Sequence, residues 1–304
     1  MREACVQLFE EYLEKNQGSA QRALAETIQA AALLGLSRTD FFTHAAFYGG
    51  TALRLLYSLD RFSEDLDFSL LEPAQNFQLS SYLDALQDEM KALGFSVEIE
   101  SRGKSMDTPI ESAFIKANTR MHTIKAGAPR TIAQRLHKNE LCKVKLEVDI
   151  DPPPGAEFEV RYIDDPIPFS VRAYSGPALL AGKMDAILYR AWQNRVKGRD
   201  WYDFAFLVRK KVPLLLPHLE ARLLQRGVYT EKVPLSPDQC VNMIAKRIEA
   251  VDFEAAKADV AAFIPSPRDL DVWSRDYFHH VLRNLQFSPF QGKTGMDDER
   301  RDLS

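Results

Sequence analysis

The sequence predicts an α/β protein that has a mixed sheet with flanking helices and a helical C-terminal half. Residues 47–70 have the pattern of a strand, a glycine turn, a helix, a short turn and a second strand. Residues 142–151 alternate apolar and charged side chains, which is typical of a strand with one buried face. From residue 213 onward the apolar positions follow helical spacing. The predicted helices there cover residues 213–226, 236–250, 253–263 and 268–286.

Further elements extend this pattern on both sides of residues 47–70. The 304 residues are enough for two domains, and we expect residues 1–173 to form the domain that holds the sheet. Residues 174–304 would form a helical domain, in which the polar segment 288–304 is expected to be mobile. The additional helices are predicted at residues 2–16, 20–35, 78–93 and 177–196, and the additional strands at 95–100, 112–117, 157–163 and 169–173.

The composition is that of an ordinary globular protein, with 45% hydrophobic residues, 27% charged residues and a net charge of −4. Because the net charge is negative, any nucleic-acid site must be a local patch. Cys5, Cys142 and Cys240 lack metal-binding spacing, which argues against a zinc site or a disulfide framework and suits a reducing cytosol. We find no signal peptide and no run of roughly 20 apolar residues that could span a membrane, and we therefore expect a cytoplasmic location.

Two carboxylates, Asp65 and Asp67, stand at the start of the second strand within residues 47–70. Side chains two residues apart on a strand share a face, so Asp65, Asp67 and Ser69 would point away from the core that the intervening apolar residues enter. Neighbouring carboxylates repel each other unless a cation lies between them, and hard oxygen ligands suit Mg²⁺. This strand therefore predicts a Mg²⁺ site.

Gly49 and Gly50 come directly before the helix-forming sequence Thr51–Tyr57. Glycines allow the backbone to approach a ligand closely, and a helix N-terminus presents free N–H groups to phosphate. Each feature alone is common, because a glycine pair is usually only a turn and Asp-x-Asp occurs on solvated surfaces. In this order, and about fifteen residues apart, they favour a nucleotide site over a strand–helix–strand corner with a polar outer edge.

The segments Gly49–Arg54 and Arg61–Phe68 resemble the signature of the AbiEii/AbiGii toxin family, which includes the MenT-type toxins. These toxins are similar to DNA polymerase β-like nucleotidyltransferases, whose motif is Gly-Ser followed by Asp-x-Asp, and Gly50-Thr51 stands in the place of that Gly-Ser. The resemblance implies a nucleotidyltransferase-type mixed sheet, an NTP substrate and Mg²⁺ as cofactor, with Mn²⁺ as an alternative. It implies metal binding by Asp65 and Asp67 and a catalytic role for Asp67. The implied nucleotide-binding residues are Gly49, Gly50, Thr51, Arg54, Ser63 and Arg190.

A third carboxylate is expected from the strand at residues 142–151. Glu147 and Asp149 lie on its outer face because both alternate with apolar residues. Polymerase β-like enzymes take a third metal ligand or a base from a strand next to the Asp-x-Asp strand. The resemblance therefore assigns this role to Glu147 first and to Asp149 second. A half-exposed strand with charged outer residues is the structural alternative.

Further charged residues follow in and after the predicted helix 177–196. Lys183 and Arg190 are seven residues apart and share a helix face. Arg199, Asp200 and Asp203 open the next helix, where Asp200 also suits the N-cap position. The resemblance implies that Lys183 neutralises the triphosphate as charge develops, and that an aspartate orients it or contacts nucleotide or metal. The spacing does not choose between Asp200 and Asp203.

A run of basic residues lies between Lys116 and Lys145, with Glu140 as its only acidic residue. Such a run is most often a solvated face. Beside a nucleotide site it also fits a track for an RNA backbone or a triphosphate, because Lys and Arg neutralise phosphates without reading sequence. Its members are Lys116, Arg120, Lys125, Arg130, Arg135, Lys138, Lys143 and Lys145.

The family resemblance implies the toxin of a bacterial type IV-like toxin–antitoxin or abortive-infection system, whose helical C-terminal domain completes the active site. In the MenT branch the nucleotide acceptor is the 3′ end of tRNA, and the expected partner is an antitoxin of the winged-helix type. Two other functions fit the motifs. One is an antibiotic-type enzyme that transfers the nucleotide to a small molecule, and the other is an NTP-binding module without transfer activity. The basic run favours an RNA acceptor.

Overall fold

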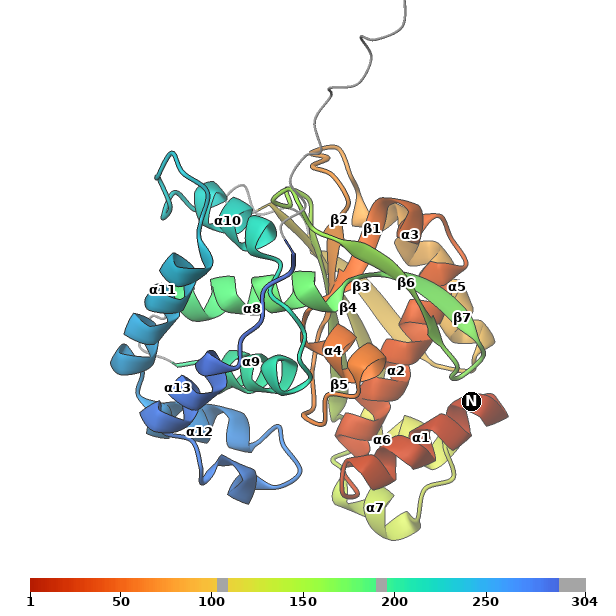
Figure 1. Cartoon of the computed structure of the whole chain (residues 1–304). Coiled ribbons are helices and arrows are strands. Elements are labelled where there is room, and N and C mark those ends of the chain that lie inside the picture. Colours follow the sequence, from red (N-terminus) through yellow and green to blue (C-terminus); the bar gives the residue numbers. More distant parts are fainter. Residues whose placement is uncertain (103–108, 190–195, 290–304) are drawn as a thin grey trace, which may run out of the picture.

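The computed structural model describes residues 1–102, 109–189 and 196–289. Within these residues a mixed seven-stranded sheet is flanked by helices, and a second group of helices lies beside it (Figure 1). This arrangement confirms the predicted mixed α/β class. The predicted mobile tail falls mostly on residues 290–304, which lie outside the described residues.

The sheet is formed by β1 (Ala45–Tyr48), β2 (Leu66–Leu70), β3 (Val97–Arg102), β4 (Ile110–Asn118), β5 (Leu141–Asp149), β6 (Phe158–Ile163) and β7 (Phe169–Tyr174). The strand order is β3-β4-β5-β2-β1-β7-β6. β2 is parallel to β5 and β1 is parallel to β7, whereas the other neighbours are antiparallel. The strands that carry the predicted carboxylates, β2 and β5, are therefore direct neighbours.

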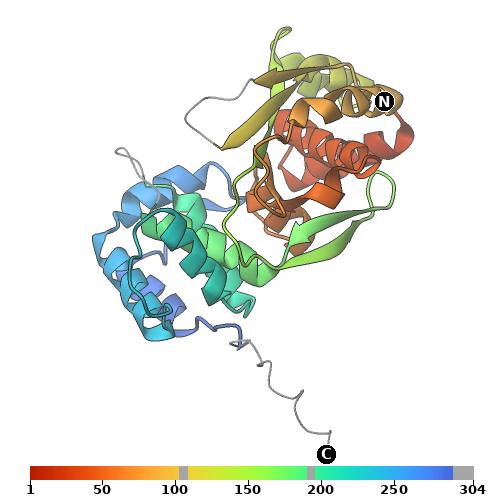
Figure 2. The same cartoon turned by 90° about the horizontal axis from the view of Figure 1, so that it is seen from above.

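The first helices surround the sheet, and the later ones form the group beside it (Figures 1 and 2). A division of the chain between residues 173 and 174 stays a prediction. The first group comprises α1 (Glu3–Lys15), α2 (Ala20–Ser37), α3 (Phe41–His44), α4 (Gly49–Tyr57), α5 (Leu83–Ala92), α6 (Thr119–Lys125) and α7 (Arg130–Arg135). The second comprises α8 (Gly176–Tyr189), α9 (Gly198–Arg209), α10 (Leu216–Gln225), α11 (Pro237–Ala250), α12 (Phe253–Ala261) and α13 (Arg275–Arg283). Two 3₁₀ helices occupy Leu79–Tyr82 and Pro267–Leu270.

Helix α2 is buried along nearly its whole length, although the sequence predicts an amphipathic helix with only one apolar face. It packs against β5 and β7 on the sheet, and α1, α5 and α6 cover its remaining sides. Its many alanines allow these neighbours to approach closely, and a helix that is apolar on all sides is expected to be a buried one. The sequence did not predict the short helices α6 and α7.

The two faces of β2 differ as the alternation predicts, but the polar face is more covered than expected. Leu66 and Phe68 are fully buried, and Phe68 packs edge-on against Phe41 at a centroid distance of 4.9 Å. On the opposite face Asp67 is half-buried, whereas Ser69 is only 1% exposed. The hydroxyl of Tyr174, at the end of β7, donates a hydrogen bond of 2.8 Å to Ser69 Oγ and closes this side of the sheet.

An aromatic cluster forms the core of the second group of helices. Trp201 of α9 packs edge-on against Phe278 of α13 at 4.9 Å, and Phe278 stacks on Phe253 of α12 at 4.6 Å. Trp273 and Phe278 are buried, so they serve packing. The cluster fixes α9, which carries Asp200 and Asp203. None of the helices in the described part of the chain is long and apolar enough to cross a membrane.

Gly198, at the start of α9, should not tolerate a side chain. A Cβ atom there would overlap the carbonyl oxygen of Ala256 and lie 3.1 Å from Cβ of Val260, both in α12. We expect Gly198→Ala to lower the free energy of unfolding by about 2 kcal/mol or more, in the range of overpacked cores. Gly182→Ala in α8 is the matched control, because the nearest atom lies 3.8 Å away; it should raise stability by up to about 1 kcal/mol. Urea denaturation measures both, and equal stabilities would contradict this prediction.

Candidate active site

The glycine turn brings the start of α4 against Asp67. Gly49 is the first residue of α4 and has φ +85°, a left-handed conformation that favours glycine. A Cβ atom at this position would overlap Oδ2 of Asp67. The carboxylate of Asp67 therefore lies over the first turn of α4, where the partial positive charge of the helix N-terminus favours an anion.

The second glycine joins the same turn to the loop that precedes β2. A Cβ atom on Gly50 would lie 2.7 Å from Nη2 of Arg61 and 2.7 Å from Oγ of Ser63. The hydroxyl of Thr51 donates a hydrogen bond to the backbone carbonyl of Asp65. Gly50, Thr51 and Ser63 are buried, so the predicted nucleotide-binding turn is a close-packed unit with this loop.

The strand register places the predicted carboxylates side by side. Asp67 of β2 pairs with Glu147 of β5, and Ser69 pairs with Asp149. Asp65 lies directly before β2, and its pKa is raised by burial and by the negative charges of Glu147 and Glu64. Three of the predicted ligands, Asp65, Asp67 and Glu147, therefore share one region, whereas Asp149 lies two residues further along the strand.

Internal contacts already occupy part of this carboxylate set. Lys145, on the same face of β5, forms an ion pair with Glu147. Asp149 accepts a hydrogen bond of 3.1 Å from the backbone N–H of Asp151, and burial raises its pKa. Across the described residues, no three His, Cys, Asp or Glu side chains converge into a group that could hold a metal ion. Carboxylates whose mutual repulsion raises a pKa suit a hard divalent cation, which would offset that repulsion. Metal binding by Asp65, Asp67 and Glu147 stays a prediction.

A buried ion-paired cluster joins the loop before β2 to the second group of helices. The guanidinium of Arg61 donates two hydrogen bonds of 2.6 Å to the carboxylate of Asp203 in α9. Nζ of Lys183 in α8 lies 2.7 Å from Oδ2 of Asp203 and 3.2 Å from Oδ1 of Asp200. The side chains of Arg61 and Asp203 are 3% and 0% exposed, and that of Lys183 is 14% exposed. We refer to Arg61, Lys183, Asp200 and Asp203 as the ionic cluster.

Mutual attraction keeps the members of this cluster charged. Burial opposes ionisation of Asp203, but Arg61 and Lys183 outweigh it and lower the pKa of that carboxyl. Burial likewise disfavours the charged form of Lys183, but Asp203 and Asp200 raise its pKa. Lys183 is thus a fixed positive charge at neutral pH, and its partial exposure leaves it as the member that a ligand could reach.

A second ion pair connects α9 to the same loop. Nη1 of Arg199 lies 3.0 Å from Oε2 of Glu64, and its guanidinium stacks over the ring of Phe263 at 4.2 Å. Glu64 directly precedes Asp65. The loop that carries the first predicted metal ligand is therefore held by α9 at two points, Arg61 and Glu64.

One predicted nucleotide-binding residue, Arg54, stands apart from this arrangement. Arg54 forms a buried ion pair with Glu26 of α2 and donates hydrogen bonds to the carbonyls of Leu59 and Asp60, at 3.2 and 2.7 Å. These contacts tie the last turn of α4 to α2, and nucleotide binding by Arg54 stays a prediction. Arg190 lies outside the described residues.

Sequence reasoning missed Arg61, Lys145 and Tyr48 as members of the site. Lys145 could have been found, because it stands two residues before Glu147 on the same strand face. Tyr48 lies opposite Asp67 on β1, and burial together with the charge of Asp67 raises its pKa well above the usual value. Arg61 lies inside the quoted motif, but its partner Asp203 is 142 positions away, so no local pattern indicates the pair.

Comparison with known proteins identifies the family. The family described as "Nucleotidyl transferase AbiEii toxin, Type IV TA system" matches residues 31–282, which is most of the chain. The chain belongs to this family. The predicted resemblance and the predicted enzyme class, a nucleotidyltransferase, are thereby confirmed. Membership in the AbiEii family also means an NTP substrate, a divalent metal and an antitoxin partner in general terms.

Two solved structures are similar to this AbiEii-family chain. The crystal structure of JHP933 from Helicobacter pylori is 19% identical with a TM-score of 0.49, and the match covers 86% of this chain and 88% of that one. A crystal structure of a candidate nucleotidyltransferase from H. pylori is also 19% identical, with a TM-score of 0.48 and coverage of 86% and 91%. A search of curated proteins found no match.

Removal of Arg61 should strongly destabilise this AbiEii-family protein, because the buried charge of Asp203 would lose its bidentate partner. We expect Arg61→Met to lower the free energy of unfolding by about 3 kcal/mol or more, and Arg61→Met/Asp203→Leu to recover much of that loss. Arg38→Met removes the ion pair with Glu89, which is 49% exposed on the arginine side, and should cost less than about 1 kcal/mol. Urea denaturation at neutral pH compares the variants. A loss for Arg61→Met no larger than for Arg38→Met would refute the structural importance of this pair.

Asp65→Asn should stabilise the fold at neutral pH. Burial, Glu147 and Glu64 raise the pKa of Asp65, so the folded protein bears the cost of ionising this group. For an acid whose pKa is raised on folding, this cost is absent below the unfolded-state pKa, grows as pH rises from that value to the folded-state pKa, and is fully present above it. We therefore expect Asp65→Asn to melt at the same temperature as wild type below about pH 4, near the ordinary carboxyl value, and at a higher temperature at pH 7. A gain in Tm that is the same at both pH values would contradict this explanation.

Proposed function

We propose that this protein transfers a nucleoside monophosphate from an NTP to the 3′ end of tRNA, with Mg²⁺ as cofactor. The acceptor hydroxyl attacks the α-phosphorus and releases its proton to solvent, the bond from that phosphorus to the bridging oxygen of the β-phosphate breaks, and pyrophosphate leaves. The observation that carries the proposal is the juxtaposition of Asp67 with Glu147 at the glycine turn of a chain in a nucleotidyltransferase family.

In this proposal the carboxylates hold the metal. Asp65 and Asp67 are the main ligands, Glu147 is the third carboxylate and Asp149 is the second choice for that role. The raised pKa of Asp65 supports the assignment, since a cation would offset the repulsion from Glu147 and Glu64 that raises it. Bound Mg²⁺ would stabilise the charge that develops on the phosphates.

The phosphates and the nucleotide would be held around the start of α4 and by Lys183, whose side chain is 14% exposed. The N-terminus of α4, with Gly49, Gly50 and Thr51, offers backbone N–H groups. Lys183 adds a positive charge whose position is set by Asp200 and Asp203. Arg54 would contribute through α4, whose last turn it anchors. Ser63 and Arg190 are the remaining proposed nucleotide contacts.

An RNA acceptor is supported by the basic run between Lys116 and Lys145, because only some of its residues form ion pairs within the protein. Lys116 and Lys145 form ion pairs with Glu100 and Glu147. The other cations of this run leave a net positive surface, because most of them form no ion pair with any described residue. These unpaired cations are Arg120, Arg130, Arg135, Lys138 and Lys143. A polyanion such as RNA would supply the missing counter-charges.

The biological setting follows from the family. We propose that the protein acts in the cytoplasm as the toxin of a type IV toxin–antitoxin or abortive-infection pair, and that a winged-helix antitoxin is its partner. We also propose that residues 1–173 and 174–304 are its two domains and that the second completes the active site. The ion pairs that Arg61 and Lys183 each form with Asp203 support this, because the cluster draws its members from both parts.

The function can be tested by incubating the purified protein with each labelled NTP, Mg²⁺ and total RNA, followed by gel separation. We expect label in the tRNA band, with loss of labelling on chelation of the metal. Asp67→Asn should lower transfer at least a hundred-fold, because it removes a proposed metal ligand without opening a cavity. Asp84→Asn, on the exposed side of α5, is the matched control and should label tRNA as wild type does.

Three outcomes would contradict the proposal. Label on an aminoglycoside but not on RNA would indicate the small-molecule enzyme. Binding of NTP without transfer to any acceptor would indicate a regulatory NTP-binding module. Full activity of Asp67→Asn at equal expression would remove Asp67 from the metal site.

A further inference from the structure

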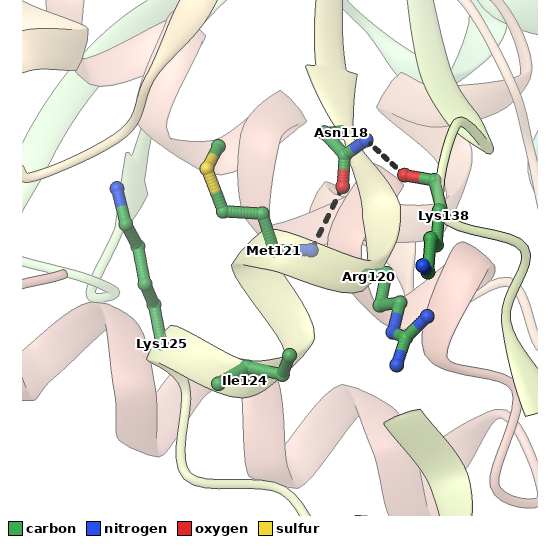
Figure 3. A pocket seen from close by; sticks show the side chains of 6 residues that line it. All are labelled: Asn118, Arg120, Met121, Ile124, Lys125 and Lys138. Carbon is green, nitrogen blue, oxygen red and sulfur yellow. Dashed lines mark hydrogen bonds between the residues drawn. The ribbon is translucent and has the colours of Figure 1, made fainter. Parts of the chain in front are cut away.

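A pocket of about 440 Å³ lies on helix α6 (Figure 3), and none of the predicted carboxylate ligands lines it. Figure 3 shows Met121 and Ile124 at its centre, with Lys125 on one side and Arg120 and Lys138 on the other. Ile124 is 57% exposed. The sixth lining residue is Asn118. The pocket therefore combines an apolar floor with a positively charged rim.

Hydrogen bonds hold this pocket in shape. Asn118 caps α6 by accepting a hydrogen bond of 2.8 Å from the backbone N–H of Met121, and its amide donates one of 2.7 Å to the carbonyl of Lys138 (Figure 3). The ring of the buried His122 stacks on Phe95 at 5.8 Å and fixes the inner side of α6. The backbone that carries the rim and the floor is thus positioned before any ligand arrives, which lowers the cost of binding.

The rim lacks counter-charges. Arg120 and Lys138 form no ion pair with any residue that the structure describes, and Lys125 donates its hydrogen bond of 2.9 Å to a neutral hydroxyl, that of Ser96. The nearby Glu140 accepts a hydrogen bond of 3.3 Å from the backbone N–H of His137. Three cations around an apolar floor match the chemistry of a nucleotide, which has an anionic phosphate and a flat, largely apolar base.

The pocket is connected to the carboxylates along one face of the sheet. Asn118 pairs with Leu141 on β5, and Leu141, Lys143, Lys145 and Glu147 alternate with buried residues and so share a face. The six residue-to-residue steps from Leu141 to Glu147 span about 20 Å at the rise of a β-strand. This distance corresponds to a few nucleotides of single-stranded RNA, and the unpaired Lys143 lies along it.

We propose that the α6 pocket binds a nucleotide of the RNA acceptor that lies a few positions before the 3′ end. Its phosphate would contact Arg120 and Lys138, and its base or ribose would pack on Met121 and Ile124. The inference rests on the proposed function, since it assumes that the acceptor end reaches Asp67. An acidic segment of a protein partner would fit the charges of the rim, but the shared sheet face that leads to the carboxylates favours the RNA.

The test compares a long and a short acceptor. KM is measured for a tRNA pool and for the trinucleotide CCA, its common 3′ end, which is too short to reach α6. In Arg120→Gln/Lys138→Gln we expect the ratio of the tRNA KM to the trinucleotide KM to rise several-fold. The slope of log Kd for tRNA against log salt concentration should fall by about 1.4, because each lost single-strand phosphate contact contributes about 0.7. Ile124→Glu, a change at an exposed position, should raise the same KM ratio.

The control is Lys232→Gln/Lys246→Gln, which removes the same charge from two exposed positions, one in the loop between α10 and α11 and one in α11. Its KM ratio and salt slope should equal those of wild type. A ratio in Arg120→Gln/Lys138→Gln equal to that of wild type would overturn the inference and leave an acidic protein segment as the occupant of the pocket. If the wild-type protein labels neither tRNA nor the trinucleotide, the proposed function has failed, which is a separate result.

Discussion

The rest of the site depends on the buried ion pairs that Asp203 forms with Arg61 and with Lys183. Asp203 is completely buried and carries a charge, so an arrangement that separated it from both cations would leave an uncompensated charge at a cost of several kcal/mol. Arg61 precedes β2, whereas Lys183 and Asp203 come from α8 and α9. The cluster therefore restricts how the second group of helices can lie against the sheet. This restriction comes from the free-energy cost of arrangements that leave Asp203 unpaired, because a buried ion pair by itself adds little to stability.

Local features of this site were predictable from the sequence, and distant pairings were not. The glycine turn, the two aspartates around β2 and the alternation of β5 are short-range patterns, and the structure reproduces them. The side-by-side position of Asp67 and Glu147 follows once β2 and β5 are neighbours. The bidentate contact between Arg61 and Asp203, in contrast, joins residues 142 positions apart and depends on tertiary packing.

The fold shows the same division between local pattern and tertiary context. The strands around Asp67 and Glu147 were predicted because alternation reports one buried face directly. The burial of α2 on all sides was not predicted. Its apolar face is visible in the sequence, but the packing of α1, α5 and α6 against its other sides is not. Ser69 lies on the predicted face, yet the hydroxyl of Tyr174 covers it. Alternation predicts the direction of a side chain, and the neighbouring elements decide whether that direction leads to solvent.

The family and the geometry answer different questions about this protein. Membership in the AbiEii family defines the reaction class, and the structure shows which basic side chains have ion-pair partners. Lys145 and Lys116 are engaged by carboxylates, whereas Arg120 and Lys138 form no ion pair in the described part of the chain. A net charge of −4 thus coexists with a local positive surface, which no average over the composition would reveal.

The close approach of α12 to Gly198 also fixes the rotation of α9 about its own axis, and therefore the directions of the side chains that follow. A helix turns by about 100° per residue, so a shift of one residue at its start would rotate Asp203 out of the ionic cluster and turn an aromatic residue toward Lys183. Because α12 leaves no room for a side chain at position 198, only one residue of the chain can occupy that point of contact. An insertion or deletion between Gly198 and Asp203 would therefore exchange the charged and aromatic faces of the helix while leaving its length and its helical propensity almost unchanged.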